Sequence, residues 1–247
     1  MLSTFHHIGK YFLLLGRTFK KPDNFKLARK QIVYEMVNLG IGSMGLIAII
    51  SVFMGAVVTL QTAANMSNPL LPGYLIGYAT RESFILEMAP TVMSLILAGK
   101  IGSNIASEVG AMRVTEQIDA LEIMGVNSAS YLILPKIIAA LLFIPIIVVY
   151  SMFLGSLGGF LVAMFNEGMT IEDYVTGLRY DFKIFSIIYA MTKTVFFAFV
   201  ITTIPSYHGY YTSGGALEIG KSSTKSVVYT SIVILIINYV LTQLLLL

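Results

Sequence analysis

Long runs without charge dominate this sequence. Residues 36–80 contain no Asp, Glu, Lys or Arg, and neither do residues 137–165. Each run exceeds the ~20 residues that an α-helix needs to cross a bilayer, and a continuous apolar run of this kind spans a membrane as a helix. Only 12% of the residues are charged, against about 25% in ordinary soluble domains. We therefore expect an all-α integral membrane protein.

Five apolar segments follow one another along the chain. They cover residues of about 40–64, 84–106, 136–165, 184–205 and 226–247. Residues 1–35 differ, because on a helical wheel Phe5, Ile8 and Phe12 fall opposite Lys10 and Arg17. We expect residues 1–35 to form amphipathic helices that lie in the membrane interface, followed by a five-span domain over residues 36–247.

Basic residues are divided unequally between the two sides of these spans. Residues 1–35 hold seven basic residues against two acidic ones. Counting basic residues only, Lys100, Arg113 and Lys136 lie in or beside the segment before the third span, and Lys221 and Lys225 lie before the fifth. The positive-inside rule places these segments in the cytoplasm. The N-terminus is then cytoplasmic and, after five crossings, the C-terminus lies outside.

A polar stretch, residues 99–135, separates the second and third spans and contains a short helix of about 115–125. Thr115 is a plausible N-cap, and Gly125 can take the left-handed position after the last turn. Ile118 and Leu121 share one face of this helix, while its acidic residues point elsewhere. The pattern fits a plain surface helix and fits equally well a helix on which a soluble partner docks.

Three polar residues lie inside or at the ends of the predicted spans. Glu87 and Lys193 carry charges that are costly in hydrocarbon, so each is expected to need a partner, a polar interior or water. Lys193 could be a structural tether or part of a pathway. Gln61, near the end of the first span, could be a satisfied polar residue or one that lines a cavity.

Several functions are disfavoured by what the sequence lacks. There is no cysteine, the three histidines have no ligand spacing, and we expect no metal site. No phosphate-binding GxxxxGK[ST] loop, HExxH motif or nucleophile elbow occurs, so no catalytic residue and no nucleic-acid partner is predicted. An ion-coupled secondary transporter that uses Glu87 and Lys193 is the alternative function, although five spans do not divide into two equal repeats.

The run SEVGAMRVTEQIDALEIMGVNSASYLILPK, residues 107–136, strongly resembles the signature of MlaE/YrbE-type permeases. These are the membrane subunits of ABC transporters that work with MCE-domain lipid-binding proteins. A second patch from Lys193 through Gly214 to Gly220 agrees, and the resemblance covers residues of about 40–245. One departure is Leu86, which stands before Glu87 where the family commonly has an arginine.

This resemblance implies a permease subunit that moves phospholipids, with residues 36–247 as the permease domain. It implies a homodimer in the bacterial inner membrane, a cytoplasmic ABC ATPase that binds ATP and Mg, and a periplasmic MCE-domain partner. This chain itself would hold no cofactor, and a small cytoplasmic accessory subunit is left open. The implied ATPase-coupling residues are Glu108, Arg113, Glu116, Gln117, Asp119, Ala120 and Leu121. The implied cavity residues are Gln61, Glu87 and Lys193.

Overall fold

The computed structural model describes residues 2–20, 25–66, 72–165 and 169–246, and within these ranges it contains helices and turns but no strand. Its elements are α1 (Leu2–Thr18), α2 (Phe25–Glu35), η1 (Met36–Ile41), α3 (Gly42–Asn65), α4 (Tyr74–Ser83), η2 (Phe84–Val92), α5 (Met93–Leu97), η3 (Ala98–Gly102), α6 (Ser103–Val114), α7 (Gln117–Ile123), α8 (Ser128–Phe165), α9 (Ile171–Arg179), α10 (Ile184–Tyr210) and α11 (Ala216–Leu246). The three η elements are π-helical turns within longer helices. The predicted all-α fold is confirmed.

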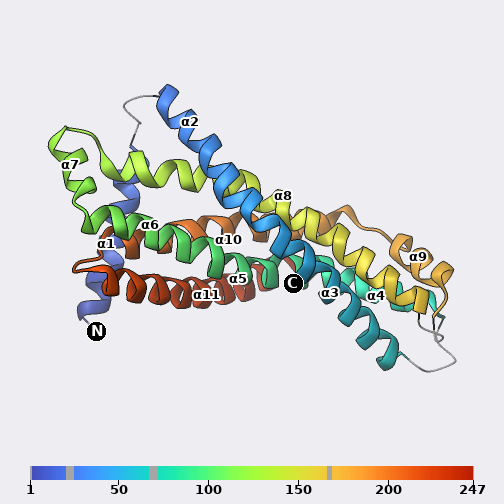
Figure 1. Ribbon diagram of the computed structural model, residues 1–247. Helices are drawn as coiled ribbons and strands as arrows, with labels where there is room; N and C mark the ends of the chain where they lie inside the picture. The colour runs from blue at the N-terminus through green and yellow to red at the C-terminus, as the bar shows by residue number, and fades with distance from the viewer. Residues whose placement is uncertain (1, 21–24, 67–71, 166–168, 247) are drawn as a thin grey trace.

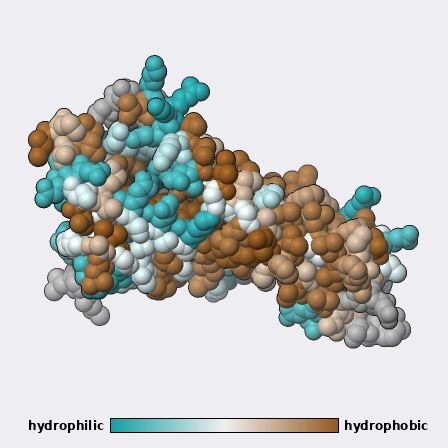
Figure 2. Space-filling model, in the orientation of Figure 1, coloured by the Kyte–Doolittle hydropathy of each residue, from teal (hydrophilic) through white to brown (hydrophobic). Residues whose placement is uncertain are grey.

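Consecutive elements join into five long apolar helices within the described residues. They span 26–65, 74–114, 128–165, 184–210 and 216–245, and each is long and apolar enough to cross a membrane. The helices run side by side as an elongated bundle, with α1 and α7 at one end and α4 and α9 at the other (Figure 1). We refer to these as the α7 end and the α9 end. Hydrophilic residues gather toward the α7 end of the visible face, and hydrophobic residues cover its middle (Figure 2).

Four of the long helices begin well before the predicted spans. The first starts at residue 26, the second at Tyr74, the third at Ser128 and the fifth at Ala216, each about two to four helical turns earlier than expected. Hydropathy locates the part of a helix that suits hydrocarbon, whereas the backbone stays helical until a turn or cap ends it. The loop residues 21–24, 67–71 and 166–168 lie outside the described ranges.

Glycines allow α3 and α8 to pack backbone against backbone. A Cβ placed on Gly55 would lie 1.9 Å from the carbonyl oxygen of Gly155, and one on Gly158 would lie 2.0 Å from that of Val52. Small residues bring membrane helices this close because lipid provides no hydrophobic drive for association, so that van der Waals contact must hold the helices together. This packing fixes the first long helix against the third.

At the α9 end, Arg81 closes the bundle. Its guanidinium is buried and donates hydrogen bonds of 2.8 Å to the carbonyl oxygens of Leu178 and Tyr180, which joins α4 to the end of α9 and to the residue that follows it. In α9, burial raises the pKa of Tyr174 to about 12, and its hydroxyl donates to the carbonyl oxygen of Ser156 in α8. These contacts hold α9 across the ends of α4 and α8.

The N-terminal helix α1 packs on the bundle along one narrow face. The Tyr11 hydroxyl donates to Thr203 of α10 at 2.8 Å, and Leu14 is buried. Phe5, Ile8 and Phe12 are exposed. An outward row of large apolar side chains on a basic helix is what an interfacial helix presents to lipid.

Candidate functional site

The turn between α6 and α7 is tight and leaves no room for the predicted N-cap. The Thr115 hydroxyl donates to the carbonyl oxygen of Ala111 at 2.8 Å, so it completes the end of α6. Glu116 makes the turn by adopting a left-handed conformation with φ of 60°, and its side chain caps nothing. The prediction that Thr115 caps the short helix is therefore wrong, because α6 continues to Val114 and the hydroxyl bonds back into it.

The other end of α7 is as predicted. Gly125 has φ of +78°, a left-handed conformation that glycine adopts without strain. The Val126 N–H donates to the carbonyl oxygen of Leu121, and the Gly125 N–H to that of Glu122, both at 3.0 Å. This paired arrangement is a Schellman motif, and it ends α7 sharply.

Two side-chain contacts fix α7 to the rest of the bundle. Asp119 forms an ion pair with Arg113 of α6 at 2.6 Å. The Glu122 carboxylate accepts hydrogen bonds from the hydroxyls of Tyr210, at 2.8 Å, and Ser128, at 3.0 Å. These two hydrogen bonds, led by that from Tyr210, hold the pKa of Glu122 below its usual range. These contacts tie α7 to α6, to the start of α8 and to the end of α10.

The predicted coupling residues divide into an exposed group and an anchoring group. Glu116, Gln117 and Ala120 are exposed, whereas Leu121 is packed against the core next to the fully buried Ile118.

The sequence did not single out two large apolar side chains at the tip of α7. Ile123 is 88% exposed and Met124 is 68% exposed. Adjoining exposed apolar side chains offer a surface that another protein or the membrane can cover. The sequence contained a signal for this exposure. Ile123 and Met124 directly precede the helix-ending Gly125, and side chains in the last turn of a short helix have few neighbours to pack against.

Glu108 lies behind α7 rather than on its surface. The ammonium of Lys136 in α8 is buried and contacts the carboxylates of Glu35, at 2.6 Å, and Glu108, at 2.7 Å. This triad ties α2, α6 and α8 together at the α7 end. Glu108 stabilises the packing of α2, α6 and α8, and α7 is attached to α6. Its predicted role in coupling would therefore be indirect, through the position of these helices.

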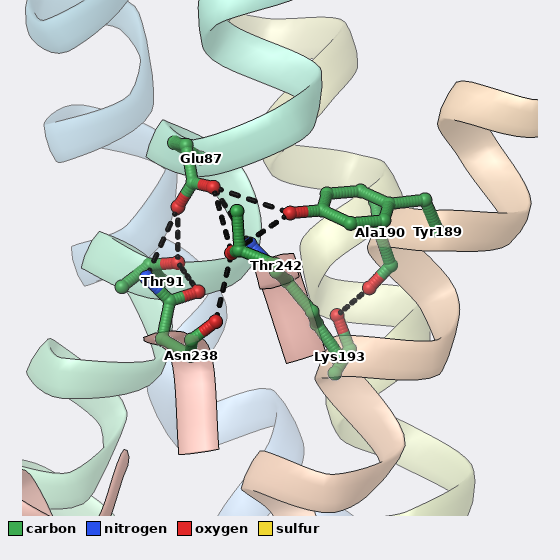
Figure 3. A network of polar contacts seen from close by, with 8 residues as sticks. Glu87, Thr91, Tyr189, Ala190, Lys193, Asn238 and Thr242 are labelled. Carbon is green, nitrogen blue, oxygen red and sulfur yellow. Dashed lines mark hydrogen bonds and ion pairs between the residues drawn. The ribbon is translucent and has the colours of Figure 1, made fainter. Parts of the chain in front are cut away.

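A second polar site lies within the long helices, where Glu87 and Lys193 face each other (Figure 3). The Lys193 ammonium is fully buried and lies 2.7 Å from the Glu87 carboxylate. It also sits over the Tyr189 ring at 4.4 Å, a cation–π contact. The sequence left open whether Lys193 is met by a carbonyl, a carboxylate or water, and the structure provides the carboxylate.

Thr91 of η2 and two residues of α11 complete the cluster around Glu87. One carboxylate oxygen accepts hydrogen bonds from Thr91, at 3.1 Å, and Asn238, at 3.2 Å, while the other is approached by Thr242 at 3.5 Å. Sequence analysis missed the two α11 residues. The signal was there, since an Asn followed four residues later by a Thr puts two polar groups on one face of an apolar helix.

Gln61 does not join this cluster. It lies on α3, is exposed, and is not among the partners of Glu87. Glu87 lies in the π-helical turn η2, which also contains Pro90. Such wide turns often occur at functional sites, because they displace side chains from their regular helical positions.

The chemistry available at these sites is binding and electrostatics. The cluster provides a carboxylate, an ammonium and neutral donors, and its charges are already paired. In the described part of the chain, no group of three or more His, Asp or Glu residues is placed to hold a metal ion. A surface helix tied to the long helices, together with a charge pair inside them, is an arrangement suited to transport.

Comparison with known proteins agrees with this arrangement. Residues 32–244 match the family model described as Permease MlaE. The chain belongs to the MlaE permease family. It is 32% identical over 255 residues to a probable ABC transporter permease protein of Rickettsia bellii, which covers 99% of this chain and 98% of that protein. The match confirms the resemblance drawn from residues 107–136.

More distant relatives of this MlaE-family permease come from photosynthetic organisms. A probable ABC transporter permease protein of Synechocystis is 30% identical, over 97% of this chain and 91% of that protein. The chloroplastic protein TRIGALACTOSYLDIACYLGLYCEROL 1 of Arabidopsis thaliana is 29% identical, over 94% of this chain and 66% of that protein. This chain is thus a multi-pass membrane protein of a permease family.

Proposed function

We propose that this protein is the non-catalytic permease subunit of an ABC transporter that moves phospholipids between the bacterial inner membrane and a periplasmic MCE-domain lipid-binding protein. A separate cytoplasmic ATPase, which binds ATP and Mg, drives the movement. The observation that carries the proposal is α7, a short surface helix between the second and third long helices that is bonded to three of the long helices.

The exposed side of α7 supports the docking of a second protein. Glu116, Gln117 and Ala120 are uncovered, and the adjoining Ile123 and Met124 offer apolar area. Interfaces commonly combine an apolar centre with a polar rim. The relatives' designation as ABC transporter permeases fits an ATPase as the protein that docks.

The outer face of α11 supports a homodimer. Five large side chains on this helix are exposed and recur at helical spacing: Val228, Ile232, Leu235, Ile236 and Tyr239. Glu87 is 38% exposed although Lys193 is fully buried, so one side of the charge pair is open. Two copies that meet along this side would enclose a cavity into which Glu87 points, where a lipid headgroup could be received.

A lipid cargo is supported by the name of one relative and by the mixed character of this cavity face. One relative carries the name of a galactolipid, trigalactosyldiacylglycerol. A ligand with a polar head and apolar chains matches a face that carries a single polar cluster among apolar side chains.

Reconstituted vesicles test this function. The purified permease, its ATPase and the MCE-domain protein are combined, and transfer of fluorescent phospholipid between the membrane and the MCE-domain protein is followed. We expect transfer to require ATP and all three proteins. Flux that is driven by an ion gradient through vesicles containing this chain alone would instead support a secondary transporter that uses Glu87 and Lys193.

A further inference from the structure

A groove of about 810 Å³ lies between α1, the end of α10 and the start of α11. It is separate from the Glu87 cluster and from the surface of α7. Tyr210, which bonds to Glu122 of α7, neighbours Tyr211 in its wall, so the groove lies at the α7 end. Nothing described so far gives it a role.

Basic side chains gather in this groove. His7, His208, Lys221 and Lys225 all line it. Glu218 is the acidic residue that also lines it, and its carboxylate is already 2.6 Å from the Lys221 ammonium. The groove therefore has a net positive charge with Lys225 unmatched in its lining, and a groove of one sign concentrates ligands of the opposite charge.

Aromatic side chains in the wall of the groove are held in place by contacts with one another. His208 stacks on Tyr229 with ring centroids 5.4 Å apart, and the Tyr207 hydroxyl is 2.8 Å from Nδ1 of His7. Tyrosine rings with one polar end are common where a protein meets the headgroup region of a membrane.

The groove changes from polar to apolar in the same direction along both of its long helices. On α11, Lys225 is followed by Tyr229 and then by Val233, and on α10 the wall runs back from His208 to Ile204 and Val200. Eight residues of helix from Lys225 to Val233 extend about 12 Å. This is close to half of the ~30 Å hydrocarbon thickness, the depth that one leaflet's acyl chains fill.

We propose that this groove binds an anionic phospholipid of the leaflet at the α7 end, with its phosphate beside Lys225 and His208 and an acyl chain along Val233 and Phe12. The exposed apolar row of α1 continues the groove into the lipid. The shared chemistry is a phosphate group, and the apolar half of the groove is what selects a lipid over free phosphate. This site is independent of which lipid is transported and of the ATPase.

The chain contains no tryptophan, so a single introduced tryptophan reports on one place. Phe12→Trp puts the reporter in the groove, and Phe5→Trp puts it on the same helix outside the groove. Each protein is reconstituted into phosphatidylcholine vesicles that contain either phosphatidylglycerol or phosphatidylcholine with brominated chains, which quench tryptophan on contact. The ratio of the two quenching curves gives the relative affinity for the anionic lipid.

For Phe12→Trp we expect a preference of about fivefold for phosphatidylglycerol, the size that one lysine near an anionic headgroup provides. Adding Lys225→Gln should bring the ratio close to one, and Lys225→Arg should keep it. Phe5→Trp should show a ratio near one throughout. Lys30→Gln is the matched control, since Lys30 is an exposed lysine of α2 outside the groove, and it should leave the Phe12→Trp ratio unchanged.

Two results would overturn the site. Equal quenching of Phe12→Trp by both brominated lipids would show that the groove has no preference. An equal loss with Lys30→Gln and Lys225→Gln would show only the general charge of the surface.

A third arm distinguishes the source of the phosphate. Relief of quenching by inorganic phosphate, but not by chloride at equal ionic strength, would assign the groove to free phosphate and contradict the lipid. Because no ATP or partner protein is present, failure of this site would leave the proposed transport function untouched.

Discussion

Lys193 is an ammonium buried completely within an apolar helix, and the Glu87 carboxylate compensates its charge. Removing one partner of a buried ion pair is costly because the other charge stays behind without compensation. Replacing both partners removes the ion pair without leaving an uncompensated charge in the protein interior. The two kinds of variant therefore separate the value of the pair from the cost of breaking it.

We predict that Lys193→Met lowers the free energy of unfolding by about 3 kcal/mol, the low end for a broken buried pair, because Glu87 retains some solvent. The double variant Glu87→Gln/Lys193→Met should recover most of this loss. Thermal unfolding of the three proteins in one detergent measures the effect. A double variant no more stable than Lys193→Met would contradict the pairing.

Glu122 attaches α7 to the bundle through hydrogen bonds that depend on pH. Its pKa is lowered in the folded protein, chiefly by the Tyr210 hydrogen bond, so its contribution is present above the usual carboxyl pKa of ~4.3 and is lost as pH falls through the lowered value. We predict that Glu122→Gln speeds hydrogen exchange of residues 117–123 at neutral pH. The difference from wild type should disappear in acid, and a difference that persists there would contradict this role.

Charged residues inside apolar segments were readable from the sequence, whereas their partners were not. Glu87 and Lys193 stand out because each interrupts a long apolar run. Asn238 and Glu122 meet partners 151 and 88 positions away, and only the packing of α11 and α10 brings them together. The pattern of one helix contains no information about which face of another helix it will meet.

Among the elements, α7 depends on its exposed tip for the proposed docking. Burial of an isoleucine contributes about 1.5–3 kcal/mol, so we predict that Ile123→Asp weakens ATPase binding by at least about tenfold. The Kd of the purified proteins in detergent measures this. Ile184→Asp, at another exposed isoleucine, on α10, is the control and should bind as wild type does. Equal weakening by both variants would count against a specific surface.

The close contact of α3 with α8 predicts how an added methyl group changes the stability of the protein. Gly55→Ala would put a methyl group against the Gly155 backbone, which cannot rotate away, and should cost about 1–3 kcal/mol. Gly45→Ala lies on the same helix in open space and should change stability little or raise it by up to ~1 kcal/mol. Similar melting temperatures for the two variants would contradict the packing.

The sequence predicted one end of α7 correctly and the other end wrongly. Gly125 was predicted correctly, since a left-handed turn after a helix favours glycine whatever the surroundings. Thr115 was predicted wrongly, because a threonine between two helices can serve either one, and here the longer α6 claims its hydroxyl. The conformational freedom of glycine is enough to predict the role of Gly125. The role of Thr115 depends on where α6 ends, which the local sequence does not determine.

At the scale of the whole molecule, the two ends of the bundle have different chemistry. The α7 end holds the Lys136 triad, the tethered α7 and the basic groove, whereas Arg81 closes the α9 end from within. A protein that docks on α7 is thus connected, through Glu122 and Tyr210, to the helix that contains Lys193. The helix α10 therefore links the α7 end to the polar cluster within the long helices.

We propose that an ATPase docks on this permease at α7. The chain has no cysteine, so Ala120→Cys on α7 and a cysteine in place of the exposed Glu172 on α9 each create one attachment point. Each variant is labelled with a photo-crosslinker in membranes that also contain the ATPase, and the adducts are identified by mass spectrometry. We predict an adduct of the permease with the ATPase from position 120 and none from position 172. An adduct from position 172 alone, or no adduct from position 120 while the complex stays intact, would contradict the account.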